Sequence, residues 1–345
     1  MIGQALFQKL QEHPKYLLIE KCFPFLAFGG GFGWDSFTLG QVVKTMDLFV
    51  LSIYFVGSTI LLLLLPKVSS KYSKKLLWGI QFSFGALFSA LTILYFKSAG
   101  GIMGLLVVLG LGILLLANEF FFAKGSRQSV LLVMHLLIGM MYLNFLLPHL
   151  VHGVGFGWML LSSLLAFGLT HLLWKNSGEA KAKVRYAMII VLMVFVGAWY
   201  VNAIPPVPLV LKDGFAAVNR VNYSGQVEQI SWFEEWTKKK QETPIGKDGK
   251  VWYFSSVFAP SEVKVDLEHR WWKETANGWQ KTDVIPLRLG RGGREEGWRF
   301  YSNKGRGLLG DWKVQTALKN GPILGESSFR VVESSPRTLK KRDLP

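Results

Sequence analysis

The strongest constraint in this sequence is a series of apolar runs, each about as long as a lipid bilayer is thick. Up to Pro205 these runs are interrupted by short polar loops, and after Pro206 the sequence becomes charged and rich in tryptophan. A bilayer core of about 30 Å requires roughly 20 apolar residues in a helix. The first part of the chain therefore predicts an α-helical polytopic membrane bundle, and the second part predicts a water-soluble domain.

Seven segments meet the length requirement for a transmembrane helix. They are residues 18–34, 46–66, 77–96, 102–122, 128–148, 156–174 and 186–204. The first is the weakest, because it contains Glu20 and Lys21 and ends in a glycine-rich stretch. The sequence thus predicts a transmembrane domain over residues 18–204 with about seven crossings, and six or eight crossings stay open as alternatives.

The charges of the loops predict how this domain is oriented. Lysine and arginine gather in the loops 67–75, 123–127 and 175–185, whereas 35–45, 97–101 and 149–155 carry few of them. This alternation follows the positive-inside rule. With seven crossings, the N-terminal stub (1–17) is cytoplasmic and the C-terminal domain lies on the opposite side of the membrane. In a bacterium, such a chain would be a multi-pass protein of the inner (cytoplasmic) membrane with a periplasmic C-terminal domain.

The net charge of +16 is spread over both parts of the chain. Because the first part is apolar, these cations indicate membrane topology and contact with anionic lipid headgroups rather than binding to nucleic acid. The only cysteine is Cys22. An intramolecular disulfide is therefore excluded, and the soluble domain must be stabilised by its own core.

Alternating side chains predict β-strands in the last third of the chain. The expected strands are 251–258, 263–272, 283–289, 298–302, 311–318 and 328–332, and turns rich in glycine separate several of them. Strands at this spacing predict an antiparallel, immunoglobulin-like sandwich.

Two further regions flank the expected sandwich. The sandwich is expected to cover residues 248–335, after a juxtamembrane linker (205–247) and before a basic disordered tail (336–345). Within the linker, residues 230–240 favour an amphipathic helix, which would lie either on the lipid surface or against the sandwich.

The same strands resemble a known family. The segments VWYFSSVFAP, LEHRWW, VIPLRLGRGGREEGWRFYSNK, GDWKV and GESSFRVV are similar to the bacterial domain-of-unknown-function family 2914. The N-terminal stretch FGGGFGWDSFTLG resembles the element that opens the membrane region of its longer members. The resemblance implies this architecture and a bacterial origin, and it implies no activity.

One candidate ligand-binding site is a group of basic residues at a glycine-rich turn. Its members are Arg291, Arg294, Arg299 and Lys304. Such turns can present backbone N–H groups to an anion, and arginine binds phosphate or carboxylate through two N–H groups. The alternative is a solvated hairpin turn in which Glu295 and Glu296 pair with some of the cations.

His269 and Trp271 form a second candidate, because the strand period places both on the apolar face. A histidine in that position is usually a core residue whose ring is bonded to a backbone carbonyl. Contact with a ligand is the other interpretation.

Polar residues within the membrane segments form a third set of candidates. They are Asp35, Asp47, Glu119, His135, His149, His152 and His171. Ionisable groups at membrane depth are costly, so each suggests a function. His149 and His152 could share a metal ion with Asp35 or Asp47, and Glu119, His135 and His171 could form a proton path. Structural or interfacial roles are the alternative for all seven.

Motifs of catalysis are missing from the sequence. It has no Gly-x-Ser-x-Gly, His-Glu-x-x-His, Cys-x-x-Cys or nucleotide-binding loop. We therefore assign no catalytic residue and no cofactor, and expect a non-enzymatic envelope protein whose sandwich binds a protein partner or an anionic glycan or lipid. An integral-membrane enzyme or transporter that acts on a lipid-linked or small ionic substrate is the alternative.

Overall fold

The computed structural model describes residues 32–39, 43–99, 106, 109–113, 128–177, 182–228, 240–259, 263, 265–288, 297–334 and 338–344. Two of the seven expected transmembrane segments, 18–34 and 102–122, lie largely outside these residues. So does the amphipathic helix expected at 230–240.

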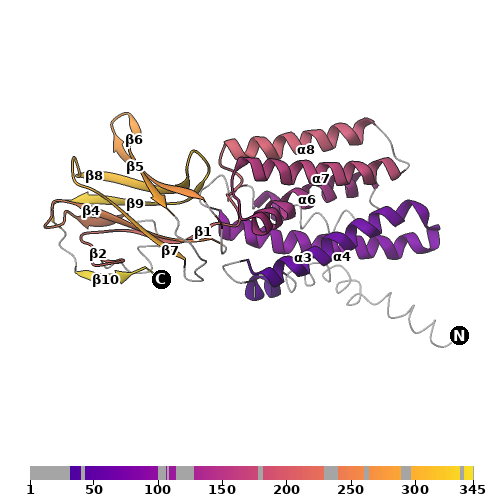
Figure 1. The fold of residues 1–345 in the computed structure, drawn as a ribbon, viewed down its shortest axis with the longest axis horizontal. Helices are drawn as coiled ribbons and strands as arrows, with labels where there is room; N and C mark the ends of the chain where they lie inside the picture. The colour runs from indigo at the N-terminus through magenta and orange to yellow at the C-terminus, as the bar shows by residue number, and fades with distance from the viewer. Residues whose placement is uncertain are drawn as a thin grey trace, which may run out of the picture.

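Five described helices are long and apolar enough to cross a membrane (Figure 1). They are α3 (Thr45–Leu64), α4 (Ser70–Ser98), α6 (Gln128–Val151), α7 (Phe156–Asn176) and α8 (Ala182–Tyr200), and a 3₁₀ turn, η1 (Leu65–Lys67), extends α3. Each coincides with an expected segment. The prediction of apolar, membrane-length helices is confirmed for these five, and the exact number of crossings stays a prediction.

Two helices have different ends from those expected, for local reasons. Helix α4 starts at Ser70 because the lysine-rich residues before the apolar run contain neither proline nor glycine and are compatible with a helix. Helix α8 stops at Tyr200 because Asn202 adopts a left-handed backbone conformation with φ of 56°. This conformation commonly ends helices, and Pro205 and Pro206 follow it.

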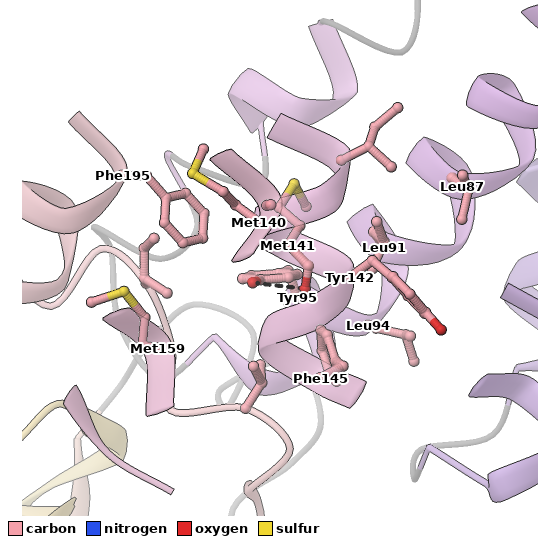
Figure 2. Close-up of a cluster of buried hydrophobic side chains, with 14 of the residues drawn as sticks. Leu87, Leu91, Leu94, Tyr95, Met140, Met141, Tyr142, Phe145, Met159 and Phe195 are labelled. Carbon is pink, nitrogen blue, oxygen red and sulfur yellow. Dashed lines mark hydrogen bonds between the residues drawn. The ribbon is translucent and has the colours of Figure 1, made fainter. Parts of the chain in front are cut away.

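Helix α6 is central to the bundle, since it contacts α3, α4, α7 and α8. Its side chains Met141, Tyr142 and Phe145 are buried in a cluster with Tyr95 of α4 (Figure 2). The ring of Tyr95 meets that of Phe145 edge-on at 5.2 Å. Asn144 of α6 donates a hydrogen bond to the Tyr95 hydroxyl over 3.2 Å, so the polar atoms in this cluster are paired.

Ten described strands follow the helices. They are β1 (Val210–Ala217), β2 (Ser224–Glu228), β3 (Gln241–Pro244), β4 (Val251–Phe258), β5 (Asp266–Thr275), β6 (Gly278–Arg288), β7 (Trp298–Lys304), β8 (Gly310–Leu318), β9 (Ile323–Val332) and β10 (Leu339–Asp343). They form a five-stranded sheet in the order β3-β9-β8-β5-β6, a three-stranded sheet in the order β1-β4-β7, and the pair β10-β2. All six expected strands are present, and the predicted C-terminal β-rich domain is confirmed.

The two larger sheets enclose a common core. Tyr253 of β4 belongs to the same buried cluster as Trp271 of β5, Trp312 of β8 and Phe329 of β9. Two facing sheets with a shared core are compatible with a sandwich. The immunoglobulin-like topology itself stays a prediction.

The β domain is attached to one end of the helical bundle (Figure 1). Ile204, Val207 and Leu209, which follow α8, belong to the same hydrophobic cluster as core residues of the helices. That cluster also contains Val257 of β4 and Leu267 of β5. The core of the β domain therefore continues directly into the core of the bundle at this end.

Three expectations about the β region need correction. The stretch 205–247, expected to be a linker, contains β1, β2 and β3. The tail 336–345, expected to be disordered, contains β10, whose backbone pairs with β2 from Leu339 to Asp343. The domain is also not purely antiparallel, because β3 pairs with β9 in parallel. All three differences arise from backbone pairing between distant segments, which leaves little trace in local sequence periodicity.

Candidate functional site

The His269 ring is fully buried between the two sheets and is held by two hydroxyl groups. Its Nε2 atom is hydrogen-bonded with Ser255 Oγ at 2.8 Å, and its Nδ1 atom with Ser302 Oγ at 2.8 Å. The Tyr253 ring packs edge-on against the imidazole at 4.9 Å. Trp271 donates its indole N–H to the same Ser302 hydroxyl over 3.0 Å.

This environment keeps the histidine neutral. Burial lowers the pKa of His269 to about 3, because a charged ring would lose its hydration and gain no carboxylate in return. A neutral imidazole has one N–H donor and one acceptor nitrogen, and one hydroxyl can satisfy each. The geometry therefore agrees with a core histidine, although serines take the place of the expected backbone carbonyl.

A small basic pocket opens beside this core. It has a volume of about 250 Å³, and Trp271 and Ile285 provide apolar lining. Lys304 and Arg306 provide positive charge, and Asp283 provides the only carboxylate among the lining residues. Lys304 pairs with Asp283, and this contact lowers the pKa of the Asp283 carboxyl below its usual value. The Arg306 side chain is exposed.

A further lysine next to this pocket increases the excess of positive charge. Lys273 and Lys304 both approach the ring of Trp312, at 5.4 Å and 5.2 Å from its centroid. Lys273 also donates a hydrogen bond to the Gly307 carbonyl over 2.6 Å. The side chains at and beside the pocket thus carry three cations and one anion, which favours an anionic ligand.

The structure does not bring together all of the basic residues that the sequence suggests as one ligand-binding site. Residues 298, 300, 302 and 304 occupy one face of β7, and Phe300 and Ser302 on that face are buried. Arg299 points from the opposite face, so it does not reach the pocket that Lys304 lines. Arg291 and Arg294 lie outside the described residues.

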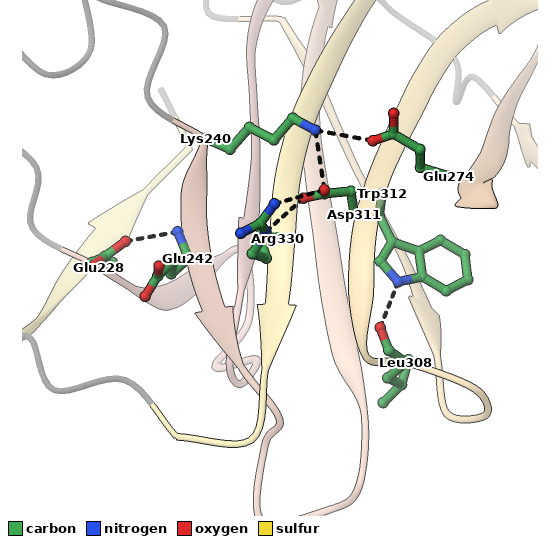
Figure 3. A network of polar contacts seen from close by, with 8 residues as sticks. All are labelled: Glu228, Lys240, Glu242, Glu274, Leu308, Asp311, Trp312 and Arg330. Carbon is green, nitrogen blue, oxygen red and sulfur yellow. Dashed lines mark hydrogen bonds and ion pairs between the residues drawn. The ribbon is translucent and has the colours of Figure 1, made fainter. Parts of the chain in front are cut away.

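A second charged network lies on the five-stranded sheet (Figure 3). Arg330 of β9 binds both carboxylate oxygens of Asp311 at 2.8 Å each. Lys240 bridges Asp311 and Glu274 at 3.3 Å and 3.1 Å. The bonds from Arg330, followed by Lys240, lower the pKa of the Asp311 carboxyl. Because its charges are paired, this network supports strand pairing more than it offers a ligand site.

A match to a protein family covers the strands that build the basic pocket. Residues 264–331 match the model of DUF2914, described as a protein of unknown function. The predicted resemblance is confirmed. The matched DUF2914 segment runs from β5 into β9, so it contains His269, Trp271, Lys304 and Arg306.

Comparisons with other proteins add little to this match. No curated protein matches the sequence. An immunoglobulin-like protein from Pseudomonas aeruginosa aligns at 13% identity over 34% of this chain and 97% of its own, with a TM-score of 0.18. The alkylpurine DNA glycosylase AlkC from Pseudomonas fluorescens aligns at 8% identity over 76% of this chain and 82% of its own, with a TM-score of 0.20. Such scores support no conclusion about the fold or activity of this chain.

In the helical bundle, His135 has a setting like that of His269. Its Nε2 and Nδ1 atoms are hydrogen-bonded at 2.9 Å with the hydroxyls of Thr59 and Thr170. The Phe55 ring stacks on the imidazole at 5.1 Å. These contacts connect α3, α6 and α7 and satisfy both ring nitrogens, as a structural role requires.

The carboxylates and histidines that were considered as metal ligands have separate partners. Asp47 accepts a hydrogen bond from the backbone N–H of Lys44 over 2.9 Å at the start of α3. Asp35 accepts one from the Ser89 hydroxyl of α4. His149 is hydrogen-bonded with the Thr45 hydroxyl at 3.3 Å. Over the described part of the chain, no three His, Cys, Asp or Glu residues gather as a metal ion would require.

The remaining membrane candidates are His152, His171 and Glu119. His152 adopts a left-handed backbone with φ of 56° in the turn between α6 and α7. His171 stacks between Phe167 and Trp174, with ring centroids at 6.0 Å and 5.0 Å. Glu119 lies outside the described residues, so the suggested proton path through Glu119, His135 and His171 stays a prediction.

Sequence reasoning missed three charged residues at this site: Asp283 and Arg306, which line the pocket, and Lys273, which lies beside it. A usable signal existed for Arg306, because it lies in a Lys-Gly-Arg-Gly turn much like the Gly-Arg-Gly-Gly turn that was considered. The other two come from β5 and β6. Only the folded structure shows that Asp283 pairs with Lys304 and that Lys273 approaches the same Trp312 ring as Lys304.

Proposed function

We propose that this chain is a non-enzymatic, multi-pass protein of a bacterial inner membrane that presents a β domain on the periplasmic side. The β domain, which we propose to be an immunoglobulin-like sandwich, would bind an anionic glycan of the cell envelope through the pocket beside Lys304 and Arg306. The observation that carries this proposal is the unbalanced charge at that pocket, where three cations accompany a single carboxylate.

The size and lining of the pocket support an acidic sugar unit as ligand. Its volume of about 250 Å³ is small for an extended chain but suits one charged ring or substituent. Trp271 and Ile285 give the pocket an apolar lining, and Lys304 and Arg306 would give charge-assisted hydrogen bonds to carboxylate or phosphate.

The position of the pocket also favours a ligand outside the membrane. Lys304, at the end of β7, pairs with Val251, which belongs to the core cluster within the β domain. At the other end of β7, Trp298 pairs with Val257, which belongs to the cluster shared with the helices. The pocket therefore lies at the end of β7 that points away from the bundle.

The charge distribution along the helices supports a periplasmic β domain. Helix α8 runs from Ala182 to Tyr200 and then enters the β domain, so Lys183 and Arg185 lie at the opposite end of the bundle. Lys67, at the end of η1, and Lys71, in the first turn of α4, lie at that same end (Figure 1). Lys175, in the last turn of α7, lies there as well, because α7 and α8 run in opposite directions. By the positive-inside rule, that end is cytoplasmic.

Binding can be tested with the full chain purified in a mild detergent. The probes are polygalacturonate, a polymer of acidic sugars, and dextran, a neutral polymer. We expect binding to polygalacturonate alone, and we expect Arg306→Glu to weaken it about tenfold or more through loss of a charge-assisted contact. Lys341→Glu on β10 is the matched control, because it makes the same charge change at an exposed residue away from the pocket.

Two results would oppose the proposal. Equal binding to dextran would show that charge is not recognised, and equal weakening by Lys341→Glu would show that only the overall charge matters. Orientation has its own test, a C-terminal alkaline phosphatase fusion, which is active only outside the cytoplasm. An inactive phosphatase fusion together with a fluorescent C-terminal green fluorescent protein fusion would place the β domain in the cytoplasm.

A further inference from the structure

A second and larger pocket lies where the helices meet the β domain. It has a volume of about 650 Å³. At β6 it lies on the opposite face of the strand from the basic pocket, because Val284 lines it, whereas Asp283 and Ile285 line the basic pocket. Its helical side consists of Phe156, Trp199, Tyr200 and Asn202, and its β side includes Glu268, Arg270, Lys281, Val284 and Asn320.

The helical side of this pocket is formed at the ends of two apolar helices, α7 and α8. Phe156 is the first residue of α7, and Tyr200 is the last residue of α8. The two rings pack with their centroids at 5.3 Å, and Trp199 lies next to them at 6.4 Å from Phe156. Tryptophan and tyrosine are enriched where a membrane meets water, at the depth of the lipid headgroups. The pocket is thus placed at headgroup depth.

The β side of the pocket offers positive charge in a fixed geometry. Arg270 donates from Nε to Glu268 over 2.6 Å and from Nη2 to the carbonyls of Leu318 and Gly321 over 2.9 Å and 3.1 Å. These contacts orient the guanidinium, and the hydrogen bonds found within the described residues leave Nη1 unused. Lys281 is exposed at the same pocket and adds a second cation.

We propose that this junction pocket binds the headgroup of an anionic phospholipid from the adjacent leaflet. The ligand phosphate would take hydrogen bonds from Arg270 Nη1 and from Lys281, since an oriented guanidinium and an ammonium both bind phosphate oxygens. The acyl chains would leave the pocket past Phe156 and Tyr200 into the bilayer. Asn202 and Asn320 supply amide groups for the polar substituent of the headgroup.

The charge of the pocket explains the preference for an anionic headgroup. The ion pair of Arg270 with Glu268 balances one cation, and Lys281 leaves a net positive charge. A zwitterionic headgroup would bring its own cation close to Lys281, whereas an anionic headgroup would not. Each lysine or arginine near a membrane surface strengthens binding to anionic lipid by roughly fivefold.

The test uses the full chain in a mild detergent, titrated with phosphatidylglycerol or with phosphatidylcholine of the same acyl chains. Native mass spectrometry counts the lipid molecules retained, and thermal unfolding measures the stabilisation they give. We expect one phosphatidylglycerol to be retained in preference to phosphatidylcholine. Lys281→Ser should weaken its retention about fivefold.

A second variant fills the pocket without changing its charge. Val284 lines the pocket with 46% of its surface exposed. Val284→Trp should abolish specific retention, and an aromatic residue is well tolerated on an exposed strand. The matched control is Leu309→Trp, because Leu309 is also 46% exposed but does not line this pocket. Arg270 is not used as the main test, since its bonds to Glu268 and to two carbonyls make its loss destabilising.

Three outcomes would overturn the lipid proposal. The first is equal retention of the two lipids, and the second is unchanged retention in Val284→Trp. The third is equal stabilisation by inorganic phosphate and by phosphatidylglycerol at the same concentration, which would identify a site for soluble phosphate. Polygalacturonate binding is measured on both variants as well, because Val284 lies between Asp283 and Ile285, which line the basic pocket. Loss of lipid retention with unchanged polygalacturonate binding separates the lipid site from the glycan site.

Discussion

Trp271 donates its indole N–H to the hydroxyl of Ser302 over 3.0 Å, and that same hydroxyl is hydrogen-bonded with His269. The indole also lines the basic pocket. The wall of the proposed glycan site is therefore fixed by a buried polar network rather than by packing alone. Such a network restrains the ring in one orientation, because any rotation would leave a buried donor without a partner.

Ser302→Ala should destabilise the β domain and weaken glycan binding together. The change removes the acceptor of the Trp271 N–H and one partner of His269, and each unsatisfied buried group costs about 1–3 kcal/mol. We expect a loss of about 2–4 kcal/mol in the free energy of unfolding, measured in urea by tryptophan fluorescence on the full chain. Ser328→Ala, at an exposed serine of β9, is the control and should leave both quantities unchanged.

The stability of the β domain should fall in acid partly because of His269. The pKa of this residue is about 3 in the folded protein against 6.5 in the unfolded chain. Between these values the unfolded chain binds the extra proton, so stability decreases as the pH falls from about 6.5 toward 3. The slope approaches about 1.4 kcal/mol for each pH unit.

His269→Gln provides the matched comparison for this pH dependence. Its amide has one donor and one acceptor end and can bridge Ser255 and Ser302 without titrating. The difference in stability between the two proteins should therefore shrink or reverse on acidification, measured by urea unfolding from pH 7 to pH 4. Parallel pH profiles would mean that His269 does not contribute.

Asp283→Asn should strengthen glycan binding. Asp283 pairs with Lys304 and competes with an anionic ligand for it. Removing this carboxylate leaves three cations at the pocket, and we expect binding of polygalacturonate to increase roughly fivefold, the equivalent of about 1 kcal/mol. Weaker binding by this variant would mean that Asp283 orients Lys304 for the ligand instead of competing with it.

Local sequence pattern predicted the strands that are short runs rich in apolar and aromatic residues. Val251–Phe258 appears as expected, and nearly all of its side chains are buried. Strand β1 was missed because Asp213 and Gly214 resemble a turn. In the structure the pairing of β1 with β4 shifts register between Leu211 and Asp213, so these residues form an irregularity within the strand.

For the candidate sites, too, local sequence pattern predicted burial but not the contacts between distant residues. Period-two alternation placed His269 and Trp271 in the core, and both are buried. The partners of His269 could not be predicted, since Ser255 and Ser302 are 14 and 33 residues away along the chain. Only the pairing of β4 with β7, and the packing of that sheet on β5, bring the three side chains together.

Thr170→Val should weaken the bundle by a small amount. The threonine hydroxyl is hydrogen-bonded with His135 Nδ1 at 2.9 Å, and valine keeps the shape while removing this bond. Hydrogen bonds between membrane helices contribute about 0.6 kcal/mol on average, so we expect a small decrease in the apparent melting temperature of the full chain in detergent. Thr38→Val is a control, because the Thr38 hydroxyl bonds only within its own helical turn.

The C-terminal strand should contribute to stability, in contrast to the disordered tail that the charged sequence suggested. Leu344 is 4% exposed and belongs to a buried cluster with Phe215 and Phe254. Arg342 bonds Asp213 at 2.8 Å and approaches the Phe215 ring at 4.7 Å. Leu344→Ala should lower the free energy of unfolding by about 2–3 kcal/mol through the cavity it leaves.

Exposed residues of the same strand supply the control for this prediction. Lys341→Ala keeps the backbone pairing of β10 with β2 and removes only a surface ion pair with Asp343. It should change stability by less than about 0.5 kcal/mol. Urea unfolding of the full chain distinguishes the two variants. If both variants are as stable as the unmodified chain, β10 does not hold Leu344 in the core. The expectation of a disordered tail would then be restored.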